Sequence, residues 1–268
     1  MTNSGEVRLR RLLRRAEGLV DLLLNCIAAG QPAAVEWDDF PAVTVERVLS
    51  WAHLETRAAL ALLRVPATAP AAEILLRGLL EALAHLAWIQ AAQTPAEQRC
   101  RALCYELGRT QSYADGLRKM RPDAVAHLPA DIAVRVEADL DTIRQLHRAA
   151  GCRCRGRHDG LVGADLKRLA QTVGQPYVYE LWVTSSRAAH QFAFDRIARS
   201  TQPGITGVAE ASLADRGRLL TWVVAIYGYV GQMALLLENP GQRDRFNRAV
   251  LRFTKSRALL GVVTGGTP

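Results

Sequence analysis

Hydrophobic residues recur every three to four positions through most of the chain, which is the spacing of one face of an α-helix. In residues 8–29, leucine and valine fall on one side and arginine on the other, and Gly30-Gln31-Pro32 ends the pattern. Similar segments are bounded by proline, glycine or a capping residue such as Thr94. These segments cover residues 42–64, 71–92, 94–120, 130–149, 165–173, 177–199, 212–238 and a last helix after Asn239-Pro240.

The pattern also predicts the fold class. Sustained period-two alternation is missing from the sequence, so strands are not expected. The sequence shows neither an internal repeat nor an obvious interdomain linker. We therefore predict an all-α protein, with residues 1–268 forming a single helical-bundle domain of roughly seven to nine helices.

Composition and charge fit a globular chain with an arginine-rich surface. Hydrophobic residues make up 49% of the 268 residues and charged residues 22%. The net charge of +8 leaves RNA open as a partner, and the first helix carries Arg8, Arg10, Arg11, Arg14 and Arg15. Lysine occurs only at positions 119, 167 and 255, which indicates the arginine bias of a GC-rich genome. A solvated basic surface is therefore preferred over a nucleic-acid patch.

The sequence favours a cytoplasmic protein without a membrane span. Residues 1–6 lack the apolar core of a secretory signal. Residues 219–237 are the most apolar run, but they include Tyr227, Tyr229 and Gln232, so a buried core helix is expected there. Five cysteines, an odd number, are typical of reduced thiols in a cytoplasm.

The cysteines also raise a metal site as an alternative. Cys100 and Cys104 lie one turn apart on a predicted helix, and Cys152, Cys154 and His158 follow in a later loop. Because Cys-x-x-Cys knuckles are absent, core cysteines are preferred over structural zinc. No glycine-rich phosphate loop or His-Glu-x-x-His motif occurs, so no metal and no cofactor are expected.

One predicted helix carries a stripe of polar side chains. Tyr179, Ser186 and His190 are seven and eleven residues apart, so they share one face of the helix with Trp182. Buried polar groups need hydrogen-bond partners, so this face is expected to meet another polar face or a ligand.

A second polar ladder lies on the helix predicted for residues 71–92. Arg77, Glu81 and His85 are spaced four and four, within flanks that are apolar on nearly all sides. We predict a buried helix whose Arg77–Glu81 pair meets the later stripe. The resulting network either fixes helix register or lines a pocket.

Residues 76–82, Leu-Arg-Gly-Leu-Leu-Glu-Ala, followed by the later Tyr/Ser/His helix, resemble the bacterial family called domain of unknown function 5677. The resemblance covers about residues 50–240 and implies an all-helical domain with a site at Arg77, Glu81, Tyr179, Ser186 and His190. A broader likeness to HEPN helical bundles implies a ribonuclease using His190 and Arg187. These two are only three residues apart, which departs from the HEPN pattern.

Three functions follow from these observations. The preferred one is a central polar pocket that binds a small molecule or nucleotide through Arg77, Glu81, Tyr179, Trp182, Ser186 and His190. This set suits a polar ligand with an anionic or aromatic group. The alternatives are a HEPN-like, metal-independent ribonuclease, and an interaction protein whose polar network is structural. The sequence leaves formation of a homo-oligomer open.

Overall fold

The computed structural model describes residues 4–29, 39–120, 129, 131–153, 210–256 and the single positions 167, 180, 182, 183, 259 and 262. Within this part, seven α-helices and one short 3-10 turn occur, and no strand. The helices are α1 (Ser4–Ala28), α2 (Ala42–Leu62), α3 (Ala72–Gln90), α4 (Pro95–Lys119), α6 (Ile132–Ala149), α9 (Leu213–Glu238) and α10 (Pro240–Thr254). The all-α bundle predicted from the sequence is confirmed.

Local sequence signals account for where α4 and α9 begin. The Thr94 hydroxyl accepts a hydrogen bond from the Glu97 amide at the start of α4, with Pro95 in the first turn. At the start of α9, Ser212 and Asp215 form a capping box. The helices predicted for residues 165–173 and 177–199 lie outside the described residues, except for four positions with helical backbone.

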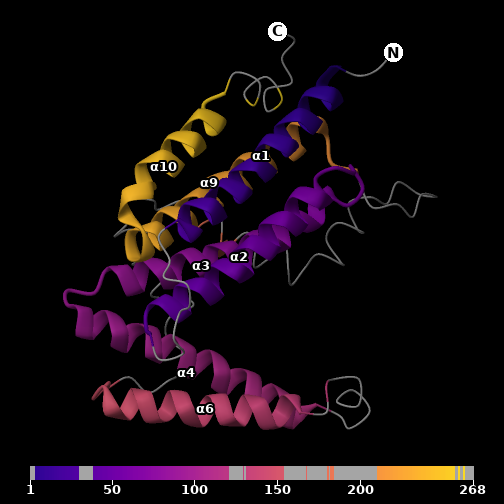
Figure 1. The fold of residues 1–268 in the computed structure, drawn as a ribbon. Helices are drawn as coiled ribbons and strands as arrows, with labels where there is room; N and C mark the ends of the chain where they lie inside the picture. Colours follow the sequence, from indigo (N-terminus) through magenta and orange to yellow (C-terminus); the bar gives the residue numbers. More distant parts are fainter. Residues whose placement is uncertain are drawn as a thin grey trace.

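Helix α9 is the centre of the larger part of the bundle. It packs against α1, α2, α3 and α10, which surround it in Figure 1. Of the described helices, α9 alone is long and apolar enough to cross a membrane, and 61% of its most apolar window is buried inside the bundle. The expected buried core helix is therefore what the structure contains.

Close approach between α9 and α10 depends on a glycine. A Cβ on Gly231 would lie 2.5 Å from Cε1 of Phe246 and 2.8 Å from Cδ2 of Leu23, both in the core. Real Cβ atoms do not approach that closely, so a larger residue at this position would force α10 and α1 away from α9.

Helix α9 is also joined to the end of α2 by Arg216, a fully buried side chain that sequence reasoning did not identify. Its guanidinium donates hydrogen bonds to the carbonyl oxygens of Leu63 and Arg64, both at 2.9 Å. It also forms an ion pair with Glu6 on α1. Buried carbonyl groups at a helix C-terminus need donors, and this arginine supplies them.

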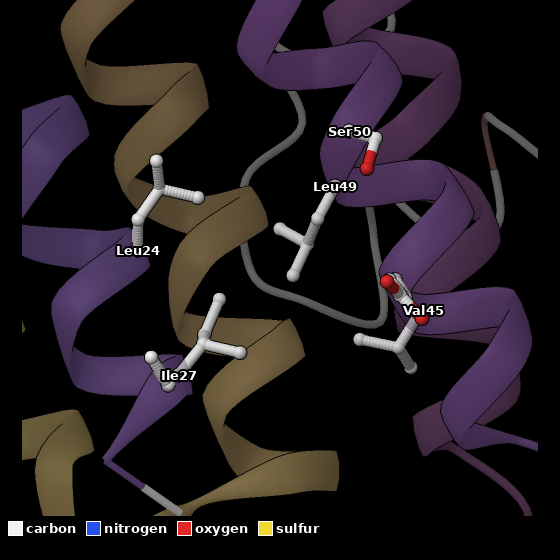
Figure 2. Close-up of a pocket in the computed structure, with 7 residues that line it drawn as sticks. Leu24, Ile27, Val45, Leu49 and Ser50 are labelled. Atoms are coloured by element: carbon white, nitrogen blue, oxygen red, sulfur yellow. The ribbon is translucent and has the colours of Figure 1, made fainter. Parts of the chain in front are cut away.

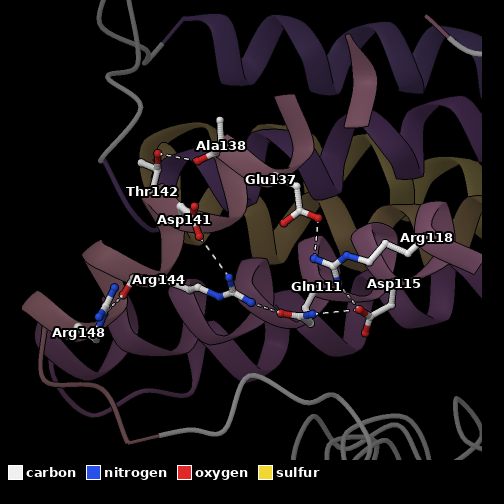
Figure 3. Close-up of polar contacts among 9 residues, drawn as sticks. All are labelled: Gln111, Asp115, Arg118, Glu137, Ala138, Asp141, Thr142, Arg144 and Arg148. Atoms are coloured by element: carbon white, nitrogen blue, oxygen red, sulfur yellow. Dashed lines mark hydrogen bonds and ion pairs between the residues drawn. The ribbon is translucent and has the colours of Figure 1, made fainter. Parts of the chain in front are cut away.

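Helices α4 and α6 form an antiparallel pair across one end of the bundle (Figure 1). Arg118 near the end of α4 pairs with Glu137 near the start of α6 at 2.5 Å, and Arg144 donates to Gln111 at 2.7 Å (Figure 3). Beneath these polar contacts, α6 buries Leu140, Ile143 and His147. The pair therefore combines an apolar seam with a ladder of charged contacts.

Candidate functional site

A polar pocket of about 90 Å³ lies where α2, α3 and α4 meet. Four of its lining residues bring polar groups, namely Trp51 from α2, Glu81 and His85 from α3, and Tyr105 from α4. The rest of the lining is Val48, Gly78 and Ala82. The His85 and Tyr105 rings are in contact, with their centroids 4.4 Å apart.

The predicted Arg77–Glu81 pair forms at the edge of this pocket. Arg77 Nε donates to Glu81 Oε1 at 2.9 Å. Both side chains retain about a third of their exposure, at 33% and 32%, so the expectation of a buried pair is wrong. Helix α3 buries ten residues, but the face that carries Arg77 and Glu81 lies at the boundary with solvent. Water therefore screens this pair in part.

Trp182, which the sequence placed on the later polar stripe, contacts the Arg77–Glu81 pair. Its indole N–H donates to Glu81 Oε1 at 3.4 Å, and the Arg77 guanidinium lies over its ring, 5.8 Å from the centroid. A guanidinium within about 6 Å of an indole face makes a cation–π contact. The structure thus brings together three of the six side chains predicted for the site, Arg77, Glu81 and Trp182. Tyr179, Ser186 and His190, together with Arg187, lie outside the described residues.

Glu55 is a second carboxylate beside the pocket, and sequence reasoning missed it. A Cβ on Gly78 would lie 1.9 Å from Glu55 Oε1, so the carboxylate fills the space that the glycine leaves on α3. Its Oε2 atom is buried and makes no hydrogen bond. Burial raises the pKa of Glu55 from 4.5 to about 7, against a hydrogen bond from Trp51 that lowers it, and the charge of Glu81 adds to the rise.

The phenol of Tyr105 stays neutral at physiological pH. Burial raises its pKa to about 12; the charges of Arg109 and Arg47 oppose this rise, and the Glu106 and Glu81 carboxylates add to it. Glu106 has a fully buried side chain and pairs with Arg47 of α2 at 2.7 Å. Its second oxygen, Oε1, makes no hydrogen bond. Acidic groups therefore approach this junction from α2, α3 and α4.

The sequence signal that could have pointed to Glu55 is a glycine inside a helical pattern. An isolated glycine in a helix costs about 1 kcal/mol relative to alanine, and often marks a close approach. Gly78 stands between Arg77 and Leu79 in such a pattern. The sequence did not reveal that a carboxylate from α2 would be the group approaching it.

The cysteines differ from the sequence-based expectation of reduced thiols. Cys100 on α4 is joined to Cys152 after α6 by a disulfide. Cys104 is also disulfide-bonded, and of the described cysteines Cys26 alone is a free thiol, buried in the core. Cys154 and His158 lie outside the described residues. In this oxidised form, no three His, Cys, Asp or Glu side chains of the described part are arranged to hold a metal ion.

A second, more apolar pocket of about 250 Å³ lies between the end of α1 and the start of α2. Figure 2 shows Leu24 and Ile27 on one side and Val45 and Leu49 on the other. Glu46 and Ser50 are its polar lining residues. Polar groups do not converge there, so few side chains are placed to select a ligand by hydrogen bonds or charge.

Two arginines of the first helix, α1, line an open groove. Arg10 and Arg14, with Arg64 from the end of α2 and Val7, line an open groove of about 310 Å³. Arg64 pairs with Glu17 at 2.5 Å. Many other arginines in the described part also form ion pairs, so their charges are paired locally, while the net charge of the chain stays +8.

Comparison with models of known protein families, with characterised proteins and with solved structures finds no match for this chain. The resemblance to the domain-of-unknown-function family stays a prediction, and functional inference rests on the site itself.

Proposed function

We propose that this helical bundle is a binding protein whose polar pocket holds the head group of a small organic cation. The observation that carries the proposal is the pair of carboxylates, Glu81 in the pocket wall and Glu55 against Gly78, with one Glu55 oxygen buried and without a hydrogen bond. An unsatisfied buried acceptor is costly, and a ligand that donates to it recovers that cost.

The charges favour a cation over an anion. Arg77 made an anionic ligand attractive at the sequence level, but its guanidinium is paired with Glu81 at 2.9 Å. Glu55 adds a second acidic group, and Tyr105 adds a neutral phenol. Of the three charged side chains at the pocket wall and against Gly78, namely Arg77, Glu81 and Glu55, two are acidic when Glu55 is ionised. The neighbouring Glu106 is already paired with Arg47 and Arg109.

Aromatic side chains around the carboxylates support the same ligand class. Trp51 and Tyr105 line the pocket, and Trp182 donates to the Glu81 carboxylate at its edge. Aromatic faces attract ammonium and guanidinium groups through the ring quadrupole.

The volume limits the ligand's size. Pockets for drug-sized ligands span roughly 300–1,000 Å³. The described pocket has about 90 Å³, which accommodates an alkylammonium head group but not a whole nucleotide. The preferred ligand is therefore a small amine or the charged end of a longer one.

The test uses methylammonium and ethylammonium chlorides as probes, with sodium chloride and sodium acetate at the same ionic strength. We expect saturable shifts of the Trp51 and Trp182 indole N–H resonances with the ammonium salts alone. Glu81→Gln should weaken binding about tenfold, which corresponds to about 1.4 kcal/mol. Glu17→Gln, which breaks an exposed ion pair with Arg64, is the matched control and should bind normally. Equal shifts with acetate, or normal binding by Glu81→Gln, would overturn the proposal.

RNA binding is a second candidate, supported by the groove of Arg10, Arg14 and Arg64. Clustered arginines on an open surface recognise phosphates, and the binding weakens as salt rises. Arg10→Ala with Arg14→Ala should reduce affinity for a fluorescent RNA and flatten its salt dependence. The same assay reports cleavage, which the HEPN-like hypothesis expects without metal and which His190→Ala should abolish.

We also infer a cytoplasmic location, in keeping with an apolar helix, α9, that is largely buried within the bundle. Cell fractionation with tagged protein tests this inference, and recovery in the membrane or exported fraction would contradict it.

A further inference from the structure

The cysteines and one histidine converge where α4 meets the end of α6. Cys100 and Cys104 are one turn apart on α4, so both face the same neighbour. Cys100 is bonded to Cys152, and Cys104 Sγ lies 3.8 Å from Nε2 of His147. His147 and Cys152 are themselves close, because the Cys152 amide donates to the His147 carbonyl at 3.2 Å.

We propose that the reduced protein binds one Zn²⁺ ion through Cys100, Cys104, Cys152 and His147. Three thiolates and one imidazole form a common ligand set for structural zinc. This site is independent of the cation pocket, and neither proposal requires the other.

The spacing of the groups fits tetrahedral zinc. With Zn–S near 2.3 Å and Zn–N near 2.0–2.1 Å, neighbouring sulfur and nitrogen ligands stand about 3.6 Å apart. The 3.8 Å between Cys104 Sγ and His147 Nε2 is close to that edge. The Cα atoms of Cys100 and Cys152 are 5.5 Å apart, so their two thiolates can share one ion once the disulfide opens.

The imidazole is suited to binding a metal. His147 is largely buried on α6, with 9% of its surface exposed. Its Nε2 atom lies 3.8 Å from Cys104 Sγ, so a ring nitrogen is in position to become the fourth ligand.

Reduction sets the state of the site. Each disulfide takes two electrons and two protons from a dithiol reductant, which leaves as its own disulfide. Binding Zn²⁺ then releases the thiol protons as the cysteines become thiolates. Disulfides are rare in a reducing cytoplasm, so in the compartment inferred above the zinc form would replace the disulfide form.

The α4–α6 pair is therefore cross-linked in either redox state, by the disulfide or by the zinc site. The disulfide and the zinc site join the same residues near the start of α4 and the end of α6. The Arg118–Glu137 ion pair holds the opposite end, as Figure 3 shows. Without either cross-link, the end of α6 near Cys152 is no longer joined to α4 by a covalent bond or a metal ion.

The test is the zinc content of full-length protein reduced with a phosphine and dialysed against Zn²⁺. We expect one zinc per reduced chain and none per oxidised chain. Cys104→Ser and His147→Gln should each lower zinc affinity at least tenfold. Cys26→Ser and His53→Gln are matched controls, at a buried free thiol and at a histidine on α2, and should retain one zinc.

A second measurement needs no variant. Zinc should protect Cys100, Cys104 and Cys152 of the reduced wild-type chain from alkylation, as mapped by mass spectrometry, while reaction of Cys26 is unchanged. Absence of zinc from the reduced chain, absence of this protection, or full zinc affinity in His147→Gln would each overturn the proposal.

Discussion

The carboxylate of Glu55 occupies the space that a side chain at Gly78 would take, and a Cβ there would lie 1.9 Å from its Oε1 atom. A glycine on α3 thus lets an acidic side chain of α2 lie against the α3 backbone, next to Glu81. The resulting burial raises the pKa of Glu55 to about 7, with Glu81 adding to the rise. One oxygen of this carboxylate, Oε2, is buried without a hydrogen bond, and the proposed cation would supply the missing donor.

Replacing Glu55 with glutamine should change how stability depends on pH. The folded-state pKa of about 7 lies above the starting value of 4.5, so folding favours the protonated form. That stabilisation is fully present below about pH 4.5 and is lost as the pH rises towards 7 and above. The 2.5-unit difference corresponds to roughly 3 kcal/mol, and partial solvent exposure reduces it to about 1–2 kcal/mol. Glu55→Gln should therefore gain about that much over wild type between pH 5 and 8.

Urea denaturation at several pH values measures this difference. Glu17→Gln serves as the control, because Glu17 forms an exposed ion pair with Arg64. A constant difference between Glu55→Gln and wild type across the range would contradict the burial of Glu55.

Adding a methyl group at position 78 should expel the Glu55 carboxylate. Its end is flexible, so Gly78→Ala should move this side chain towards water and leave the helices in place. The pKa of Glu55 should then fall towards 4.5, and alanine should add up to about 1 kcal/mol of helix propensity. NMR titration of the Glu55 carboxyl group measures the pKa directly. If the pKa stays near 7, the carboxylate does not lie where the structure places it.

Removing the Arg77–Glu81 pair should cost less than breaking a buried ion pair. Both side chains keep about a third of their exposure, so Glu81→Ala should destabilise the fold by about 1 kcal/mol, not the roughly 3–5 kcal/mol of a buried pair. Chemical denaturation of Glu81→Ala, Arg77→Ala and the double variant gives the coupling energy. A coupling above about 2 kcal/mol would show that the pair is shielded from water after all.

A methyl group at Gly231 should destabilise the bundle, while the same change at Gly18 should not. A Cβ at position 231 would collide with Phe246 and Leu23, so Gly231→Ala should cost about 1–3 kcal/mol through overpacking. A Cβ on Gly18, in α1, meets nothing within 4 Å, so Gly18→Ala should gain about 0.5–1 kcal/mol. Thermal unfolding of the two variants gives opposite shifts if α10 packs on α9 as described. Shifts of the same sign would contradict that packing.

The sequence determined the helices because helix formation depends on local signals. The apolar period, the cap at Thr94, and the proline and glycine breaks act within a few residues, and they predicted helix ends within a few positions. The sequence also brought out Arg77 and Glu81, since a spacing of four residues puts two side chains on one helix face without any tertiary information.

Only the tertiary structure decided which side chains from distant parts of the sequence contact each other. Glu55 and Gly78 are 23 positions apart in the sequence, and Arg216 binds the end of α2 across 153 residues, as measured to Leu63. The approach of Cys152 and His147 to α4 likewise depends on how two helices pack, which the periodicity of either helix leaves open. Burial, charge coupling and metal geometry are properties of such non-local contacts, so the sequence showed where side chains stand on a helix, and the packing showed which of them can act together.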